Sequence, residues 1–159
     1  MSGNGQLTLR EAYEKWADEL VRFATVLVGP GDAADVVADA FVGLLDDERS
    51  WGDVDRPRSY LFGVVANRSK MRHRAVGRRR RREERYERVT APMGGSREPV
   101  VVDAHRLLDG LSQQQRAVVY LAYWEDWTAA DIATHLGVSD GTVRKQLARA
   151  RAALREELS

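Results

Sequence analysis

The chain has 159 residues, of which 43% are hydrophobic and 31% charged, a balance that suits one ordinary domain or two small ones. It contains no cysteine, which excludes a disulfide framework and a thiolate metal site. No apolar run approaches the ~20 residues that a membrane-spanning helix needs, and the N-terminal stretch lacks the apolar core of a signal peptide. We therefore expect a cytoplasmic protein without membrane insertion.

The formal net charge of +1 hides a strong asymmetry along the chain. Residues 1–66 hold 6 Lys/Arg and 12 Asp/Glu, residues 67–88 hold 11 and 3, and residues 89–159 hold 8 and 9, which gives net charges of −6, +8 and −1. Within the last part, residues 142–155 contain five basic side chains and no acidic one. Two separate basic segments favour two contacts with a polyanion, whereas the acidic N-terminal part favours a protein partner.

The N-terminal half has the pattern of three helices separated by two breaks. Apolar residues recur every three or four positions from Tyr13 to Leu27, as on one buried helix face. The sequence GPGD at 29–32 ends this helix, and Asp32 can cap the next one, whose apolar residues repeat the spacing. A polar loop with one tryptophan covers 46–57, and Pro57 suits the start of a third helix that runs into the basic stretch.

The segment 89–102 holds two prolines and two glycines, which indicates a linker. After it, SQQQ (112–115) and TAAD (128–131) have the composition of capping boxes at helix starts. No strand-like alternation of any length is present. The sequence thus predicts an all-α fold with two small helical domains, 7–88 and 103–159, joined by a flexible linker.

Residues 128–154 predict a helix-turn-helix within the second domain. Gly137 suits the left-handed end of its first helix, and Ser139 can cap its second. Such a basic helix fits the major groove of DNA, where its first residues reach base edges and its arginines reach phosphates. The simpler alternative is a helical hairpin with a solvated basic face. The candidate DNA contacts are Ser139, Asp140, Thr142, Arg144, Lys145, Arg149 and Arg151.

From about Tyr13 to Leu158, the chain resembles the extracytoplasmic-function (ECF) sigma factors of bacterial RNA polymerase. DAADVVADAFVGLL (32–45) is similar to the family's polymerase-docking helix, RPRSYLFGVVANRSKMRHRAVGRRRR (56–81) to its promoter-melting helix, and 108–155 to its second DNA-binding domain. The resemblance implies that 7–88 is a sigma region 2-like domain for docking, minus-ten recognition and melting. It implies that 103–159 is a region 4-like domain that recognises the minus-thirty-five element. It also implies core RNA polymerase, promoter DNA and an anti-sigma factor as partners.

By this resemblance, the docking helix binds a coiled coil of the polymerase clamp, for which an acidic and partly apolar helix is a suitable partner. The family usually carries Gln followed by Glu where this chain has Ala38 and Asp39, which removes one hydrogen-bonding side chain and shortens one carboxylate. A core role is expected for Val37, Ala40 and Leu44. The residues that match contributing positions are Asp35, Val36, Asp39, Phe41 and Leu45.

The resemblance also implies that the loop after the docking helix and the basic helix meet the minus-ten element. Trp51 stands where the family has an aromatic or bulky residue, and Asn67 matches a position that contacts the single strand. Together they can offer a stacking wall and an amide to a flipped base. The alternative is that Trp51 covers the core beneath its loop. Further candidate contacts are Arg68, Lys70, Arg72, Arg74, Arg78 and Arg79.

Five successive arginines occupy 78–82, directly after a glycine. We expect Gly77 to end or loosen the third helix. The arginines would then continue as a basic extension that contacts phosphates and contributes affinity rather than sequence information.

The sequence contains no nucleophile paired with a base, no glycine-rich phosphate loop and no metal-ligand spacing, and His73, His105 and His135 are dispersed. We therefore expect no enzymatic activity, no metal and no cofactor. Two other functions stay open. One is a free-standing helix-turn-helix regulator whose N-terminal block senses a ligand or dimerises. The other is a helical adaptor or anti-sigma partner without DNA contacts.

Overall fold

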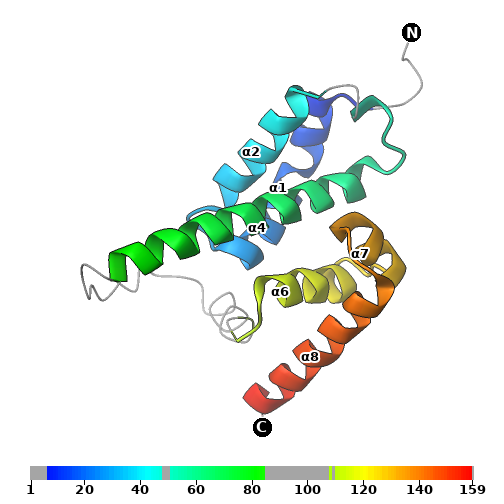
Figure 1. The fold of residues 1–159 in the computed structure, drawn as a ribbon. Coiled ribbons are helices and arrows are strands. Elements are labelled where there is room, and N and C mark those ends of the chain that lie inside the picture. The colour runs from blue at the N-terminus through cyan, green and yellow to red at the C-terminus, as the bar shows by residue number, and fades with distance from the viewer. Residues whose placement is uncertain (1–6, 48–50, 85–107, 109, 159) are drawn as a thin grey trace.

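The computed structural model describes residues 7–47, 51–84, 108 and 110–158, and every regular element in these ranges is a helix (Figure 1). This confirms the all-α fold class. The predicted linker 89–102 and His105 lie outside the described residues. The elements are α1 (Leu9–Val28), α2 (Ala33–Leu45), α4 (Pro57–Glu84), α6 (Gln113–Val119), the π-helical turn η1 (Tyr120–Trp124), α7 (Ala129–Leu136) and α8 (Asp140–Leu158).

The residues between α1 and α2 end the first helix and start the second, so that the two helices form a hairpin. Thr8 and Glu11 form a capping box at the start of α1, with the amide of Glu11 donating to Thr8 Oγ1 at 3.1 Å. Gly29 ends α1 with φ 89°, a conformation that L side chains rarely adopt. Asp32 is the N-cap residue of α2, as expected. Its side chain makes no capping bond, however, and accepts from Arg72 Nη2 at 2.9 Å instead.

α4 begins at Pro57, as the sequence predicts, because proline suits the first turn of a helix. The helix continues through Gly77 to Glu84, so the expectation that Gly77 ends or loosens it is wrong. One interior glycine costs only about 1 kcal/mol relative to alanine, and the arginines and glutamates around it are good helix formers. The basic run 78–82 is therefore helical in its backbone.

α6 starts with the predicted capping box, which Ser112 and Gln115 form reciprocally. It leads directly into η1, after which the chain turns back through Asp126, whose φ is 57°. The turn is closed by the amide of Trp127, which donates to the carbonyl of Leu121 at 2.9 Å. This turn brings the Trp127 indole back to the core.

The predicted helix-turn-helix is present as α7 and α8. Thr128 Oγ1 accepts from the amide of Asp131 at 3.1 Å, and Gly137 ends α7 with φ 69°. Ser139 Oγ accepts from an amide in the first turn of α8 at 3.1 Å. The predicted TAAD capping box is only half formed, because the Asp131 carboxylate pairs with Arg56. The apolar residues that join these two helices to the core are buried or partly buried: Ile132, Ala133, Leu136, Val138, Val143 and Leu147.

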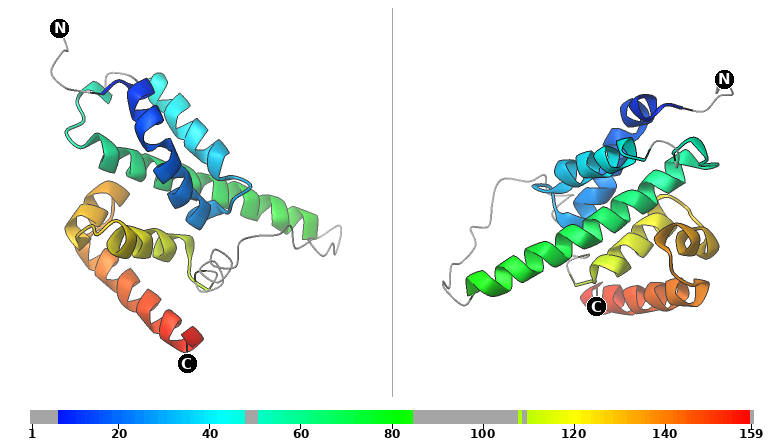
Figure 2. Two further views of the ribbon diagram at one scale, coloured as in Figure 1. Left: turned by 180° about the vertical axis from the view of Figure 1, so that it is seen from behind. Right: turned by 45° about the horizontal axis from the view of Figure 1, so that its top comes forward.

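The two predicted domains lie against each other in the described structure (Figures 1 and 2). α1, α2 and α4 pack together, α6 and α7 pack against α1 and α4, and α8 lies on the far side of α6. The C-terminal end of α4 projects beyond its neighbours. None of the helices in the described ranges has the length and apolar character that crossing a membrane requires.

One apolar core runs through both halves. The Phe23 ring of α1 lies 5.1 Å from that of Phe62 in α4 and 5.2 Å from that of Tyr120 in η1, measured between centroids. The Phe62 ring in turn lies 5.8 Å from Trp127. Each such pair contributes roughly 0.5–1.5 kcal/mol beyond the burial of its area. Aromatic packing therefore joins helices that the sequence assigns to different domains.

Candidate polymerase and nucleic-acid interfaces

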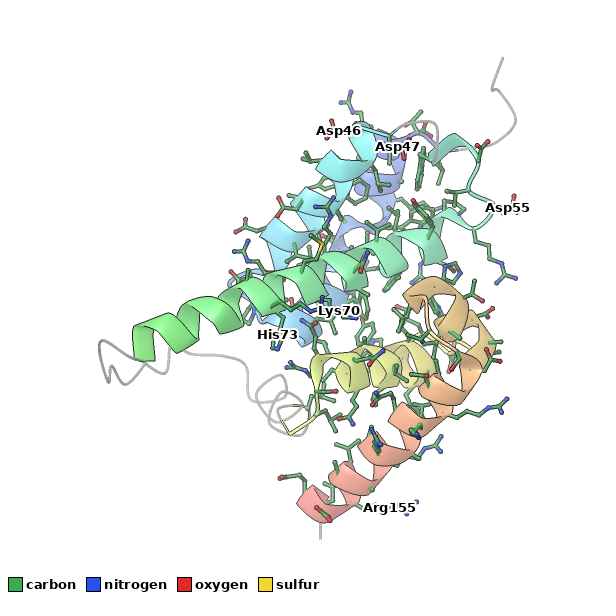
Figure 3. The ribbon with its side chains drawn as sticks, in the orientation of Figure 1. Asp46, Asp47, Asp55, Lys70, His73 and Arg155 are labelled. Atoms are coloured by element: carbon green, nitrogen blue, oxygen red, sulfur yellow. The ribbon has the colours of Figure 1, made fainter. Side chains whose placement is uncertain are left out.

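The face of α2 that points away from the core is both acidic and apolar. The helical period places its residues opposite the buried stripe. Val42 and Leu45 are large apolar side chains, and yet they keep 57% and 56% of their surface exposed. Figure 3 labels Asp46 and Asp47 at the C-terminal end of this helix. We name this face the docking strip, which consists of Asp35, Ala38, Asp39, Val42, Leu45 and Asp46.

Two of the predicted polymerase contacts lie inside rather than on this strip. Val36 is buried with 1% exposure, and Phe41 is buried against Tyr13, whose ring meets it edge-on at 5.1 Å. Val42 is not among the residues for which the sequence predicts a polymerase contact. The signal that could have found it is the phase of the helix, because Val42 follows Asp35 and Asp39 at helical spacing while Val36 and Phe41 fall on the core side.

Two of the predicted DNA contacts on α4 face α2. Arg72 Nη2 lies 2.9 Å from Asp32 Oδ1 and 3.8 Å from Asp35 Oδ2. The guanidinium of Arg68 covers Gly43, in the space that a side chain there would need. These two arginines therefore tie α4 to α2, and Arg72 shares its charge with two carboxylates.

A different face of α4 turns toward α6 and α7. Asn67, Lys70, His73 and Arg74 line a cavity of about 590 Å³ whose opposite wall comes from α6 and α7. Figure 3 shows Lys70 and His73 on the side of α4 that looks toward α6. Among the residues that the structure describes, none that lines this cavity carries a carboxylate. The structure thus brings together three of the predicted minus-ten residues, Asn67, Lys70 and Arg74, at a positively charged wall.

Trp51 is buried in this structure, with 7% of its surface exposed. Its indole Nε1 donates to the main-chain oxygen of Leu7 at 2.8 Å, and its ring lies 6.4 Å from that of Tyr60. Asn67, the predicted partner of Trp51 at a flipped base, is exposed on α4. The indole therefore belongs to the core in the free chain.

The outer face of α8 is basic and open to solvent. Arg144, Lys145 and Arg149 are exposed, as the sequence predicts. Arg151 is exposed as well, but its Nε donates to Tyr123 Oη at 2.6 Å. Thr142 is partly buried, and its hydroxyl lies 2.9 Å from Ser139 Oγ. Asp140 is exposed in the first turn. The side chains of Arg78 and Arg79 lie outside the described part of the chain.

Three side chains at the contact between the halves have shifted pKa values, and burial raises the pKa of one of them, Tyr120. Partial burial disfavours the charged form of Arg58, but its hydrogen bonds to Glu125 and Glu19 outweigh this and raise its pKa. Partial burial lowers the pKa of His135. The negative charge of Asp131 opposes this shift, and the positive charge of Arg56 reinforces it. Among the described residues, no three His, Asp or Glu side chains are grouped as a metal site requires.

The chain matches known families over both halves. Residues 12–80 match Sigma-70 region 2, and residues 102–154 match Sigma-70, region 4. The ECF RNA polymerase sigma factor SigL of Mycobacterium tuberculosis is 33% identical over 161 residues, which cover 92% of this chain and 86% of SigL. The chain belongs to the ECF family of RNA polymerase sigma factors.

A further relative of this chain is also a sigma factor. The RNA polymerase sigma-E factor of Streptomyces coelicolor is 35% identical over 146 residues, covering 89% of this chain and 80% of that protein. Two solved structures share the fold. RpoE of Bartonella quintana, in complex with the anti-sigma factor NepR, has a TM-score of 0.74 at 23% identity and covers 94% of this chain and 95% of its own. CnrH, in complex with the cytosolic domain of CnrY, has a TM-score of 0.62 at 24% identity, and the alignment covers 99% of this chain and 90% of the CnrH chain.

Family membership establishes the function that the sequence predicts. The sigma factor binds core RNA polymerase and directs promoter-specific transcription initiation, by recognising minus-thirty-five and minus-ten elements and aiding promoter melting. Sigma factors are initiation factors rather than catalysts. A free-standing regulator is not favoured, because this one chain matches both sigma regions.

Proposed function

We propose that the sigma factor carries out initiation through three separate surfaces. The docking strip of α2 binds the polymerase clamp, the Asn67, Lys70 and Arg74 face of α4 meets the minus-ten region, and the outer face of α8 reads the minus-thirty-five element. The proposed domain limits are 7–88 and 103–159 with the linker 89–102, a division that the two family matches support.

The outer face of α8 carries most of the argument. All five basic side chains between 142 and 155 are exposed, the segment contains no carboxylate, and the helix follows the left-handed turn at Gly137. A helix of this kind can enter the major groove while its cations hold phosphates on either side. Arg144 and Lys145, in the first turns, are the proposed base-edge or phosphate contacts, and Arg149 lies farther along.

The docking strip has the composition of a protein contact. Apolar side chains at its centre can be buried by a partner, and the carboxylates around them can pair with basic groups of a coiled coil. Val36 and Phe41, which are buried in the core, then contribute by fixing the position of α2. Because Ala38 has no polar atoms beyond its backbone, the strip makes fewer hydrogen bonds there than the Gln that is usual in the family.

Melting requires capture of unstacked bases and no covalent step. Each base stacked on an aromatic ring contributes roughly 1–3 kcal/mol, so one pocket can bias strand opening. We assign this pocket to Asn67 and to Trp51, once the loop releases the buried indole. Arg68, Lys70, Arg72 and Arg74, together with Arg78 and Arg79, supply phosphate contacts upstream of the melted segment. On this proposal the protein is not an enzyme and needs no metal or cofactor.

The sigma factor is proposed to act in the cytoplasm and to be held inactive by an anti-sigma factor. RpoE of Bartonella quintana was solved with the anti-sigma factor NepR. The RpoE structure and the CnrH structure each align with nearly the whole of this chain. An anti-sigma factor that covers the docking strip would block polymerase binding directly.

Reconstitution with core RNA polymerase tests this assignment. We expect the sigma factor to co-purify with core and to direct run-off transcription from promoters mapped upstream of start sites that appear on overexpression. A chain that neither binds core nor directs initiation, yet shifts duplex DNA alone, would contradict the proposal and support a free-standing regulator.

A further inference from the structure

The cavity between α4, α6 and α7 has the size of a small-molecule site. Its volume is about 590 Å³, and Leu27 at the end of α1 also contributes to its lining. Pockets that hold small organic ligands have volumes of roughly 300–1,000 Å³. The proposed function uses only the α4 wall of this cavity, as a contact for promoter DNA. It leaves the space enclosed by the other walls without a role.

The α4 wall carries positive charge that its described surroundings do not neutralise. Lys70 and Arg74 both line the cavity, one helical turn apart, and Figure 3 shows Lys70 on the side of α4 that looks toward α6. Within the described ranges neither side chain forms an ion pair, whereas Arg72 pairs with Asp32. Because like charges at this spacing repel each other, an anion held between them is stabilised.

The α6 wall supplies neutral hydrogen-bond donors. Gln114 lines the cavity, and its Oε1 accepts from Gln146 Nε2 at 3.3 Å, so its own amide nitrogen keeps its hydrogens for a ligand. Ser112 also lines the cavity, and its Oγ accepts from the amide of Gln115 at 3.1 Å, which leaves the hydroxyl hydrogen to donate. Neutral donors and two cations thus line one space, and such groups bind phosphate oxygens.

Another part of the lining is apolar. It includes Leu27, Ala66 of α4, Ala117 of α6 and Leu136 of α7. A bare phosphate ion would leave these side chains against water, whereas an organic group attached to the phosphate would cover them. The Asn67 amide, which also lines the cavity, offers a donor and an acceptor to polar atoms of such a group. The lining therefore suits an organic phosphate better than an inorganic ion.

We propose that this cavity binds a small organic phosphate of nucleotide size, with its phosphate groups on Lys70 and Arg74 and its organic part between α4, α6 and α7. Binding itself does not depend on the promoter contacts. The consequence for transcription rests on the proposed function, in which Asn67, Lys70 and Arg74 meet the minus-ten region. An occupied cavity would compete with promoter DNA for these side chains, so the sigma factor would respond to a small phosphorylated molecule directly.

Isothermal titration calorimetry on the full chain, without polymerase or DNA, tests the site. The probes are adenosine 5′-diphosphate, adenosine and inorganic phosphate. We expect the diphosphate to bind at one site per chain with a Kd below about 1 mM. Adenosine and phosphate should each bind at least about tenfold more weakly, because neither alone reaches both the cations and the apolar lining. The diphosphate should also raise the melting temperature, since only the folded chain has the cavity.

The first variant combines Lys70→Ala with Arg74→Ala. It should weaken diphosphate binding at least about tenfold, because it removes two charge-assisted hydrogen bonds. Both side chains are exposed on α4 and alanine is a good helix former, so we expect the fold to be kept. The matched control combines Arg10→Ala with Arg155→Ala, which removes two exposed cations outside the cavity. It should change the Kd less than about twofold, because salt screens distant charges.

The second variant, Gln114→Glu, tests whether the α6 wall takes part. It keeps an acceptor for Gln146 Nε2 and turns the donor that lines the cavity into a carboxylate. Diphosphate binding should weaken at least about tenfold, because the new charge repels the phosphates. Gln115→Glu is the matched control, since it adds the same charge one residue away, keeps the capping box and does not line the cavity. It should change the Kd less than about threefold.

Three results would overturn the proposal. One is no heat of binding and no thermal shift with the diphosphate at about 1 mM. Another is a Kd that each variant changes no more than its control does, with helical content unchanged by circular dichroism. The third is phosphate that binds as tightly as the diphosphate, which would leave an inorganic anion site. Initiation with core polymerase is measured separately. A chain that binds the diphosphate and fails to initiate counts against the proposed function only, and one that initiates without binding it refutes only the site.

Discussion

The indole Nε1 of Trp51 donates a hydrogen bond to the main-chain oxygen of Leu7 at 2.8 Å, although the two residues are 44 positions apart. This bond ties the loop before α4 to the segment that precedes α1. The aromatic ring that is the candidate base-stacking wall is thus a core residue in the free sigma factor. Base capture on the indole therefore requires this hydrogen bond to break first.

Trp51→Ala should lower the free energy of unfolding by about 3–5 kcal/mol, as expected for truncating a buried aromatic residue. Urea unfolding followed by circular dichroism measures this. At a temperature where the variant is folded, open-complex formation should fall more on duplex promoter DNA than on a pre-melted template. Trp51→Phe, which keeps a ring, should recover most of the duplex activity. Equal losses on both templates would indicate that the indole has only a structural role.

Val42→Arg should weaken binding to core RNA polymerase at least about tenfold, or about 1.4 kcal/mol, because it places a charge at the centre of the docking strip. The melting temperature should not change, since this side chain is already exposed in the free protein. Leu158→Arg makes the same change at an exposed apolar residue at the end of α8 and serves as the control. Fluorescence anisotropy with labelled sigma factor gives both affinities, and equal effects would rule out the strip as the docking surface.

Replacing Arg144 and Lys145 together with alanine should reduce transcription from promoters that depend on the minus-thirty-five element. A lost base contact costs about 1–3 kcal/mol, and each lost phosphate contact reduces the salt dependence of binding by about one unit of slope. Arg155→Ala, which removes an exposed cation near the end of the same helix, should change neither quantity appreciably. Transcription at several salt concentrations distinguishes the two variants. An unaffected double variant would favour an adaptor without DNA contacts.

The stability of the folded sigma factor should fall on acidification through the range just below pH 6.5. Partial burial lowers the pKa of His135 below its ordinary value of 6.5, so the folded state binds fewer protons than the unfolded state. The folded state is therefore not penalised by this group above that range, and it loses stability as protonation becomes favourable in the unfolded state. Asp131 and Arg56 are the charged groups that act on this imidazole, and Lys70, His73 and Arg74 line the same cavity.

Urea unfolding followed by circular dichroism at several pH values checks this pH dependence. The free energy of unfolding of the parent should decrease between about pH 7.5 and pH 5.5. His135→Gln, which cannot be protonated, should reduce that slope. A slope that is unchanged in this variant would assign the pH dependence to other groups.

Most of the secondary structure follows from signals within three or four residues, which is why the sequence predicts it well. The Ser112 capping box, the start of α4 at Pro57 and the left-handed Gly137 are all present. Gly77 is the exception, because one glycine does not interrupt a helix whose neighbours favour helix strongly. Periodicity also predicts that α2 has a buried stripe. It was the family resemblance that assigned Val36 and Phe41 to a surface role.

The sequence alone determined that the chain is helical, where its charges gather and which family its motifs resemble, because these depend on residue type and short-range spacing. Tertiary structure decided which positively charged side chains form ion pairs. Arg72, for example, pairs with Asp32, 40 residues away. It also decided that Trp51 is buried and that Gln113 bonds to Leu27 across 86 residues. Such contacts depend on how helices pack in three dimensions, and no local pattern specifies which distant groups will meet.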